Sequence, residues 1–334
     1  MRTALVTGSA GFIGHHASEM LVRRGWSVVG IDNLSDYYDP ELKRARHARL
    51  EGPDFHPIIA DIAEPGRLAA IMGEHRPETV IHLAAQAGVR HSIDAPRSYV
   101  EANLVGTFEL LEAARAHPPG HLLLASTSSV YGAGQDMPYR ETMKADTQMS
   151  FYAATKKATE AMAHSYAHLY KLPTTLFRFF TVYGPWGRPD MALFRFVRAI
   201  DEGRPIDVYN HGRMRRDFTY VTDLVDGLIG LIDAVPVAGR PVCEADGISP
   251  VAPCRVVNIG NGAPVELDAF IDAIEAAMGR TAGRNLMAMQ PGDVPATWAD
   301  TTLIEALLGR PLDRTPIEDG VRAFVDWYRS HYAA

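Results

Sequence analysis

The sequence predicts an α/β fold, a doubly wound parallel sheet accompanied by a second, smaller, interleaved α/β domain. Three observations lead to this prediction. Short β-rich runs alternate with amphipathic stretches from the first residues onward, a spaced set of glycines follows the first run, and both patterns change after residue 180. From there Pro and Gly become frequent and the helical stretches become shorter. Strands that alternate with helices form βαβ units on a parallel sheet.

The elements of the first part follow one another in a regular order. Strands are expected where apolar and β-branched residues run together, at residues 3–7, 27–31, 55–60, 79–84, 122–126 and 174–180. Helices are expected where apolar residues recur at helical spacing, at residues 13–24, 41–50, 65–75, 96–117 and 150–170. Helices placed between successive strands cover both faces of the sheet.

The second part is expected to interleave with the first. Residues 235–253 are rich in Pro and Gly and predict a loop. The strand-like residues 255–259 that follow are expected to return the chain to the first sheet. The expected division is therefore residues 1–180 and 215–262 for the first domain, and residues 181–214 and 263–334 for the second.

Composition excludes several classes of protein. The chain has 334 residues, of which 47% are hydrophobic, so it can bury a large core. A net charge of −7 without a long Lys/Arg run argues against a nucleic-acid or anionic-membrane partner. Neither a secretory leader nor an apolar stretch of roughly 20 residues is visible. The two cysteines lie outside metal or redox spacing, so we expect a cytoplasmic location.

The glycines after the first strand predict a dinucleotide-binding site. Gly8, Gly11 and Gly14 lie between the first strand and the first helix. This Gly-x-x-Gly-x-x-Gly spacing permits a tight turn and lets the backbone approach a pyrophosphate at the helix N-terminus. The sheet is therefore expected to be of the Rossmann type.

Asp32 at the end of the second strand favours NAD over NADP. Its carboxylate is placed to accept hydrogen bonds from the adenosine ribose, and its charge would repel a 2′-phosphate. Lys43, Arg44 and Arg46 follow nearby, and their helical spacing predicts a solvated face rather than a phosphate site.

A catalytic group is expected after the fifth strand. Tyr152 and Lys156 lie four residues apart on a predicted helix, so both side chains can reach one site. A nearby ammonium and the positive nicotinamide ring favour the phenolate, which makes Tyr152 a usable general base. Thr127, from the hydroxyl cluster after the strand, would hydrogen-bond the same reacting hydroxyl.

With these residues in place, the chain resembles the extended short-chain dehydrogenase/reductases, and within them the UDP-glucuronate 4-epimerases. Residues 32–40, 82–90, 178–188 and 216–220 carry the resemblance. It implies an isomerase that inverts C4 of UDP-glucuronate through a transient 4-keto intermediate, with NAD recycled in place. It also implies a homodimer that is joined through the helices at 96–117 and 150–170.

The resemblance implies two sets of binding residues besides the triad of Thr127, Tyr152 and Lys156. The cofactor set is Gly8, Gly11, Phe12, Ile13, Gly14, Asp32, Asn33, Asp61, Ile62, Leu83, Ala84, Ala85, Tyr152 and Lys156. The UDP-sugar set is Arg90, Ser128, Ser129, Thr181, Arg188 and Arg216. In the second set Arg216 would meet the phosphates, and Thr181 and Arg188 would hold the sugar carboxylate.

Related activities stay open as alternatives. Dehydratases of similar fold carry an Asp-Glu pair where this chain has Ser128 and Ser129, so water elimination lacks its acid. UDP-glucose or UDP-N-acetylhexosamine 4-epimerases are an alternative, but the UDP-glucose enzymes usually have Asn at Thr181 and Arg at Gln290. UDP-glucuronate decarboxylases commonly have Glu at Ser129 and are the closest rival.

Two further classes are weighed against an enzyme of this kind. A dinucleotide-binding redox sensor or scaffold tends to lose the base, and here Tyr152 and Lys156 are both present. A metal enzyme is not indicated, because the histidines, including the adjacent His15 and His16, form no ligand spacing. We therefore expect no metal.

Overall fold

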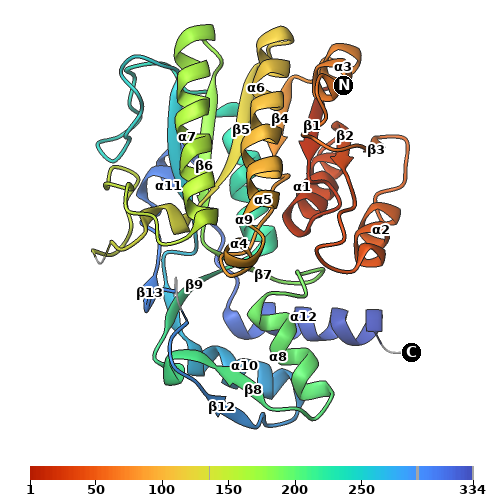
Figure 1. Ribbon diagram of the computed structural model, residues 1–334, viewed down its shortest axis with the longest axis vertical. Helices are drawn as coiled ribbons and strands as arrows, with labels where there is room; N and C mark the ends of the chain where they lie inside the picture. The colour runs from red at the N-terminus through yellow and green to blue at the C-terminus, as the bar shows by residue number, and fades with distance from the viewer. Residues whose placement is uncertain (135, 291–292, 333–334) are drawn as a thin grey trace.

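A seven-stranded parallel sheet forms the centre of the computed structural model, which describes residues 1–134, 136–290 and 293–332 (Figure 1). Residues 291–292 and 333–334 of the expected second domain, and residue 135 of the first, lie outside this description. The strand order is β10-β6-β5-β4-β1-β2-β3. These strands are β1 Thr3–Thr7, β2 Ser27–Asp32, β3 Phe55–Ile59, β4 Thr79–His82, β5 His121–Thr127, β6 Thr174–Phe179 and β10 Cys254–Ile259. The predicted doubly wound sheet is confirmed.

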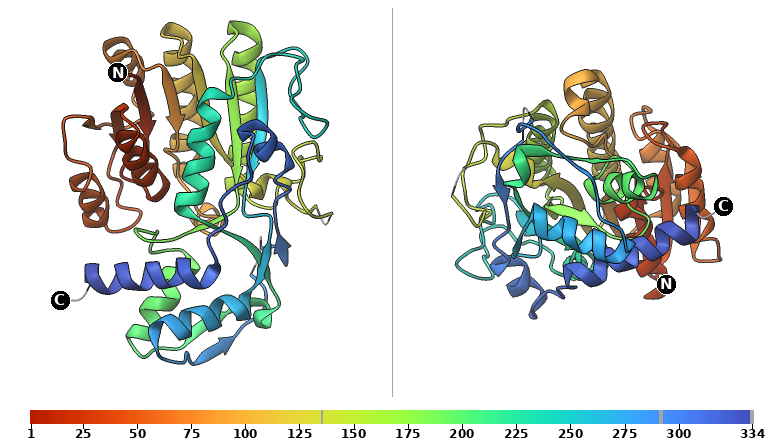
Figure 2. Two further views of the ribbon diagram at one scale, coloured as in Figure 1. Left: turned by 180° about the vertical axis from the view of Figure 1, so that it is seen from behind. Right: turned by 90° about the horizontal axis from the view of Figure 1, so that it is seen from below.

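Helices cover both faces of this sheet (Figures 1 and 2). On one face lie α3 (Arg67–His75), α6 (Gly106–Ala116) and α7 (Phe151–Tyr170), and on the other lie α1 (Phe12–Arg23) and α9 (Val221–Gly230). Successive side chains of a strand point to opposite faces. Leu5 accordingly belongs to the buried cluster under the first face and Val6 to the cluster under the second. Burial on both faces explains why the strands are almost continuously apolar.

The smaller part lies beyond the carboxyl ends of the large sheet (Figure 1). It contains the sheet β11-β9-β13, in which β7 also pairs with β9, and the strand pair β12-β8. Three helices, α8, α10 and α12, enclose a third core that includes Phe194, Phe270 and Phe324. The bounds are β7 Thr181–Tyr183, α8 Ala192–Asp201, β8 Ile206–Val208, β9 Arg215–Tyr220, β11 Pro264–Glu266, α10 Leu267–Met278, β12 Arg284–Leu286, β13 Ala296–Thr297 and α12 Ile317–Tyr332.

The chain crosses between the two parts more than once. Strand β10 returns to the large sheet and pairs with β6, which confirms the expected return at residues 255–259. Residues 235–253 contain no helix or strand, as their composition predicts. Strand β9 differs from expectation, because its hydrogen bonds go to the small sheet although residues 215–262 were assigned to the first domain. The domain boundaries stay a prediction.

The helix expected at residues 96–117 contains a π-helical segment. It consists of α5 (Pro96–Tyr99), η1 (Val100–Val105, a π-helix) and α6. Asn103 in the wide turn is buried, and its side chain bonds the backbone of Gln86 and the hydroxyl of Thr155. A π-helical turn often marks a functional site, and here it fixes the loop after β4. None of the helices among the described residues is long and apolar enough to cross a membrane.

Candidate active site

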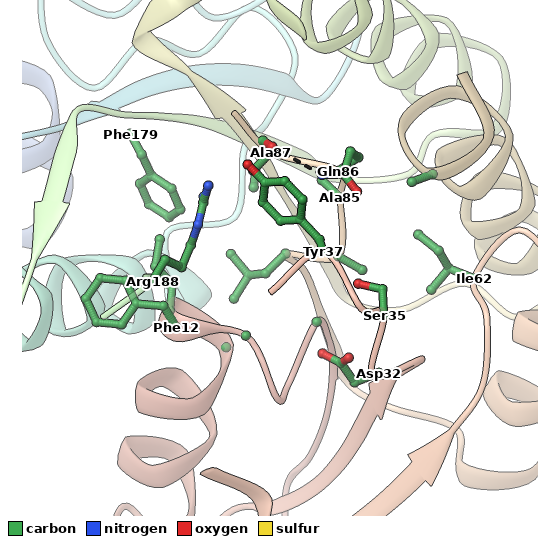
Figure 3. Close-up of a pocket in the computed structure, with 18 of the residues that line it drawn as sticks. Phe12, Asp32, Ser35, Tyr37, Ile62, Ala85, Gln86, Ala87, Phe179 and Arg188 are labelled. Atoms are coloured by element: carbon green, nitrogen blue, oxygen red, sulfur yellow. Dashed lines mark hydrogen bonds between the residues drawn. The ribbon is translucent and has the colours of Figure 1, made fainter. Parts of the chain in front are cut away.

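A cavity opens at the carboxyl ends of β1, β2, β4 and β5, where the chain passes from one half of the sheet to the other (Figure 3). Open α/β sheets bind their ligands at this switch point. All residues of the predicted cofactor set line it: Gly8, Gly11, Phe12, Ile13, Gly14, Asp32, Asn33, Asp61, Ile62, Leu83, Ala84, Ala85, Tyr152 and Lys156. Thr127 and Arg188 line the same cavity.

The loop between β1 and α1 is a cradle of bare backbone. Gly8 has a φ of +71°, and a Cβ on it would lie 2.7 Å from the backbone nitrogen of Ala84. A Cβ on Gly14 would lie 2.0 Å from the carbonyl oxygen of Gly8. Helix α1 begins after Gly11 with no side chain capping its first N–H groups. Free N–H groups at a helix start bind anions, so the loop fits the pyrophosphate of a dinucleotide.

Two carboxylates stand on the cavity wall beyond this loop. Asp32 accepts hydrogen bonds from the backbone N–H groups of Ala10 and Leu34, at 3.1 and 2.8 Å. Asp61 accepts a hydrogen bond from the side-chain amide of Asn33 at 2.9 Å. Each carboxylate oxygen can accept two hydrogen bonds. Asp32 is therefore held in place and keeps acceptors for ribose hydroxyls.

The basic residues of α2 (Pro40–Ala48) correct one interpretation of the sequence. A solvated face is wrong for Lys43 and Arg46, which are 5% and 0% exposed, while Arg44 is exposed. The ammonium of Lys43 turns toward the cavity and donates to the carbonyl and hydroxyl oxygens of Ser35, at 2.7 and 2.8 Å. Helical spacing puts Lys43 and Arg46 on one face of α2. Oxygen atoms of neighbouring loops accept hydrogen bonds from both side chains. Because Lys43 is bonded to Ser35, its burial does not argue for a 2′-phosphate.

The three predicted catalytic residues come from two elements that meet at the cavity. Thr127 is the last residue of β5, and Tyr152 and Lys156 lie one turn apart near the start of α7. The Lys156 ammonium is buried and donates to the carbonyl oxygen of Ala125 at 3.0 Å. The Thr127 hydroxyl lies close enough to Tyr152 to lower the pKa of the phenol. The structure therefore brings the hydroxyl, the phenol and the ammonium to one site.

Burial changes the pKa of both ionisable groups in this set. It raises the pKa of Tyr152 above its ordinary value, and the opposing influences are the nearby Thr127 side chain and the charge of Arg188. It lowers the pKa of Lys156 to about 8. The groups of the chain therefore keep the phenol protonated at neutral pH. A further positive charge beside Tyr152 is needed to make it a base.

A buried ion pair that the sequence did not indicate joins α7 to β6, and a hydrogen bond extends the network to β5. Glu160, one turn after Lys156, accepts hydrogen bonds from the Ser126 hydroxyl at 2.6 Å and from Nε and Nη2 of Arg178 at 2.9 and 2.8 Å. Burial would raise the pKa of Glu160, but the hydrogen bonds and charge of Arg178 lower it to about 2. Because Ser126 precedes Thr127, this network fixes the strand end that carries a predicted catalytic hydroxyl.

Ser128 and Ser129 form a short helical turn directly after the strand. The turn, η2, spans Ser128–Tyr131. The Thr127 hydroxyl donates to the hydroxyl of Ser129 at 3.2 Å, and the Ser129 N–H donates back to Thr127 at 3.2 Å. Both serines are half-buried. Ser129 therefore contacts a predicted catalytic residue, and Ser128 lies beside it.

Arg188 reaches the cavity from the loop after β7 and shares its guanidinium with a carboxylate. Its Nε donates to Oδ1 of Asp190 at 3.0 Å, and its Nη2 donates to Oδ2 at 2.6 Å. The hydroxyl of Tyr37 donates to the same Oδ2 at 3.2 Å. Thr181 lines a smaller cavity, and Arg188 lines both cavities. Thr181 and Arg188, the two residues expected at the sugar carboxylate, therefore both line the smaller cavity.

The loop that carries Arg188 is anchored to the glycine loop by Arg46. This buried guanidinium donates to the carbonyl oxygens of Trp186 and Gly187, at 2.6 and 3.2 Å. It also donates to the carbonyl oxygen of Ala10 at 2.9 Å. One side chain thus sets the spacing between the dinucleotide loop and the cation expected to meet the sugar.

Arg90 and Arg216 gather beside Asp293 rather than on the cavity wall. Arg90 donates to Oδ2 of Asp293 at 3.1 Å. Burial lowers the pKa of Arg216, the charge of Asp293 opposes that lowering, and the charge of Arg90 adds to it. Two guanidinium groups around one carboxylate leave a net positive charge, which suits a diphosphate.

The cavity also has lining residues outside the predicted sets. They are Ser35, Tyr37, Tyr38, Lys43, Ala60, Gln86, Ala87, Ala102, Ala125, Ser126, Phe179, Phe180, Val182 and Met191. Several of these lie inside residues 32–40 and 82–90, the segments that carry the resemblance, so adjacency to predicted residues was an available signal. Ala102 and Lys43 lie on helices, and their orientation toward the cavity depends on tertiary packing.

His15, His16 and Glu19 on α1 each place one potential ligand atom within 4.8 Å of the others. His15 is fully buried, and its ring nitrogens have no hydrogen-bond partner among the described residues. Burial, His16 and the charges of Arg46 and Arg49 lower the pKa of His15 to about 2. The His15 ring is therefore neutral at neutral pH.

Known proteins resemble this chain along almost all of its length. The model of the NAD dependent epimerase/dehydratase family matches residues 4–241. A probable UDP-glucuronate 4-epimerase of Rhizobium meliloti is 52% identical over 98% of this chain and 97% of its own length. UDP-glucuronate 4-epimerase 1 of Arabidopsis thaliana is 42% identical over 99% of this chain and 77% of its own. The crystal structure of UDP-glucuronic acid 4-epimerase from Bacillus cereus, in complex with UDP-glucuronic acid and NAD, has a TM-score of 0.87 and 31% identity, covering 99% of this chain and 100% of its own.

Proposed function

The chain belongs to the NAD dependent epimerase/dehydratase family, and we propose that it inverts C4 of UDP-glucuronate to give UDP-galacturonate. The observation that carries the proposal is the position of the Arg188 guanidinium. It lines the dinucleotide cavity, and its charge lowers the pKa of Tyr152. A cation there suits a sugar whose C6 is a carboxylate and whose C4 hydroxyl meets the base. Relatives with this printed activity support the same substrate.

NAD is the cofactor that fits the cavity, and when bound it supplies a reversible oxidant for C4 and a positive charge beside Tyr152. The uncapped start of α1 and the glycine loop would hold its pyrophosphate. Asp32 would accept hydrogen bonds from the adenosine ribose, and Lys156 would donate to the nicotinamide ribose. The cofactor leaves the cycle unchanged, so turnover consumes none.

Tyr152 is the base in this proposal. It would accept the proton of the C4 hydroxyl while Thr127 holds the same oxygen by a hydrogen bond. Because burial raises the pKa of Tyr152, the phenol becomes basic only when positive charge is added beside it. The sugar passes through a 4-keto form, turns within the cavity, and regains the proton from Tyr152 on the inverted alcohol.

Arg188 and Thr181 would hold the C6 carboxylate during this passage. In the 4-keto sugar the carboxylate is β to the ketone, and carbon dioxide leaves when the bond to the carboxylate carbon aligns with the ketone π system. A guanidinium binds a carboxylate in a fixed plane, so it can keep that bond out of alignment. Arg90 and Arg216 would bind the UDP diphosphate.

Purified protein incubated with UDP-glucuronate tests the proposal. We expect UDP-galacturonate without added NAD and without release of carbon dioxide, identified by chromatography of the nucleotide sugars. UDP-xylose as the product would instead establish the decarboxylase alternative. Interconversion of only UDP-glucose and UDP-galactose, or of the N-acetylhexosamines, would establish a neutral-sugar epimerase. Either result would overturn the proposed substrate or reaction.

The proposal includes a cytoplasmic homodimer. The helices expected at the dimer interface expose apolar side chains, among them Val100, Phe108 and Phe151. Burying such a face against a second copy is favourable, which supports the dimer. Cys243 and Cys254 are both free thiols, which suits a reducing compartment.

A further inference from the structure

Asp190 occupies one of the two edges through which the Arg188 guanidinium can bind a carboxylate. Asp190 takes the edge formed by Nε and Nη2, with one carboxylate oxygen on each nitrogen. A guanidinium carries five N–H donors, so the edge formed by Nη1 and the second hydrogen of Nη2 is left. That edge can also bind a carboxylate with two parallel hydrogen bonds. Asp190 therefore restrains the plane of the Arg188 guanidinium and leaves a second pair of N–H donors available for a ligand.

Tyr37 completes this restraint from another part of the fold. It lies in the loop after β2 and lines the cavity together with Arg188 (Figure 3). Its hydroxyl donates to Oδ2 of Asp190 at 3.2 Å. Burial and the charge of Asp190 raise the pKa of Tyr37 to about 12, so the hydroxyl keeps its proton. Burial would raise the pKa of Asp190, but Arg188 and Tyr37 lower it, so Asp190 stays ionised.

We propose that Asp190, supported by Tyr37, is a positioning residue that fixes the plane of the Arg188 guanidinium and thereby retains the carboxylate of the 4-keto intermediate. The inference rests on the proposed function. If Arg188 turned freely, the sugar carboxylate would turn with it and reach the alignment that releases carbon dioxide. In that leak the bond between C5 and the carboxylate carbon breaks, its electron pair passes to the enolate of the ketone, carbon dioxide leaves, and a solvent proton adds to C5.

The same pair determines how charge contributes to substrate choice. Arg188 and Asp190 together carry no net charge, so the pair orients an acidic sugar more than it attracts one. Removing the Asp190 charge should therefore strengthen binding of UDP-glucuronate relative to UDP-glucose while it loosens control of the carboxylate. A residue with a merely structural role would weaken binding of both sugars alike.

The test compares Asp190→Asn and Tyr37→Phe with the wild-type protein, with Asp326→Asn as a control at an exposed carboxylate on α12. Three quantities are measured: thermal unfolding, the dissociation constants of UDP-glucuronate and UDP-glucose by calorimetry, and the ratio of carbon dioxide released to UDP-galacturonate formed. For Asp190→Asn we expect carbon dioxide release to become measurable, with a ratio about tenfold above the wild-type background, as the loss of one charge-assisted hydrogen bond implies. Tyr37→Phe should show a smaller rise in the same direction.

Affinity separates positioning from simple damage to the site. We expect Asp190→Asn to bind UDP-glucuronate at least as tightly as the wild type, with UDP-glucose unchanged. An unchanged product ratio in both variants, or equal weakening for both sugars, would overturn the positioning role while normal wild-type epimerisation leaves the proposed function intact. Absence of UDP-galacturonate from the wild-type reaction would overturn the proposed function, and the positioning role with it.

Discussion

Replacing Glu160 with Gln should lower the free energy of unfolding by about 3 kcal/mol near neutral pH. The pKa of this carboxyl falls from an ordinary 4.5 to about 2 in the fold, and linkage converts that difference to about 3 kcal/mol. Removing one partner of a buried ion pair costs about 3–5 kcal/mol, which agrees with this value. The pair is well buried, with Glu160 and Arg178 side chains 5% and 3% exposed. Gln leaves the guanidinium buried without its charge partner.

The effect has a defined dependence on pH. Because the folded-state pKa of Glu160 lies below its unfolded value, the stabilisation is complete above pH 4.5 and is lost as the pH falls toward 2. The difference in stability between the wild type and Glu160→Gln should therefore shrink across this interval. Activity should also fall at neutral pH, since the Gln NH2 cannot accept from Arg178 and the network that fixes the strand end at Ser126 and Thr127 is disturbed.

Urea unfolding at a series of pH values measures this difference. Glu78→Gln is the matched control, because Glu78 pairs with Arg2 where both side chains are about half exposed. Such exposed pairs contribute less than about 1 kcal/mol. A loss below about 1 kcal/mol for Glu160→Gln at neutral pH, or equal losses in the two variants, would refute this account of the buried pair.

Four further substitutions probe the site and the assembly. Tyr152→Phe should lower kcat by about 10²–10⁴, the range for general bases, with little change in the binding of UDP-glucuronate; retained kcat would exclude the base. Gly14→Ala should abolish NAD binding in a titration, because its Cβ would lie 2.0 Å from the Gly8 carbonyl oxygen; normal binding would contradict the cradle. Arg188→Ala should raise the KM for UDP-glucuronate and permit carbon dioxide release, and equal turnover would remove its assigned role. Phe108→Asp should convert a dimer to a monomer in light scattering, whereas an unchanged mass would exclude that interface.

The parts of the fold and site that the sequence predicts are those fixed by local spacing. Glycines at 8, 11 and 14 determine how closely a backbone can approach, and neighbours far away in the chain do not alter this. Tyr152 and Lys156 share a helix face for a similar reason. Alternation of strands and helices likewise predicts the parallel sheet, and β10 returns to it as expected.

Features that depend on tertiary contacts were not predictable from local patterns. Helical spacing places Lys43 and Arg46 on one face, but only the packed loops determine that this face is buried. The pairing of Glu160 with Arg178 joins a helix to a strand 18 residues away and leaves no local signature. Asp190 is two residues from Arg188, yet its role depends on Tyr37, 153 residues away in sequence.

The proposed reaction inverts C4 of UDP-glucuronate by transient oxidation of that carbon. An NMR time course in heavy water tests it most directly, because it follows both the identity of the product and the origin of its C4 hydrogen. We expect UDP-galacturonate that retains its original hydrogen at C4, with no carbon dioxide released. Deuterium at C4 of the product, or UDP-xylose in place of UDP-galacturonate, would contradict it.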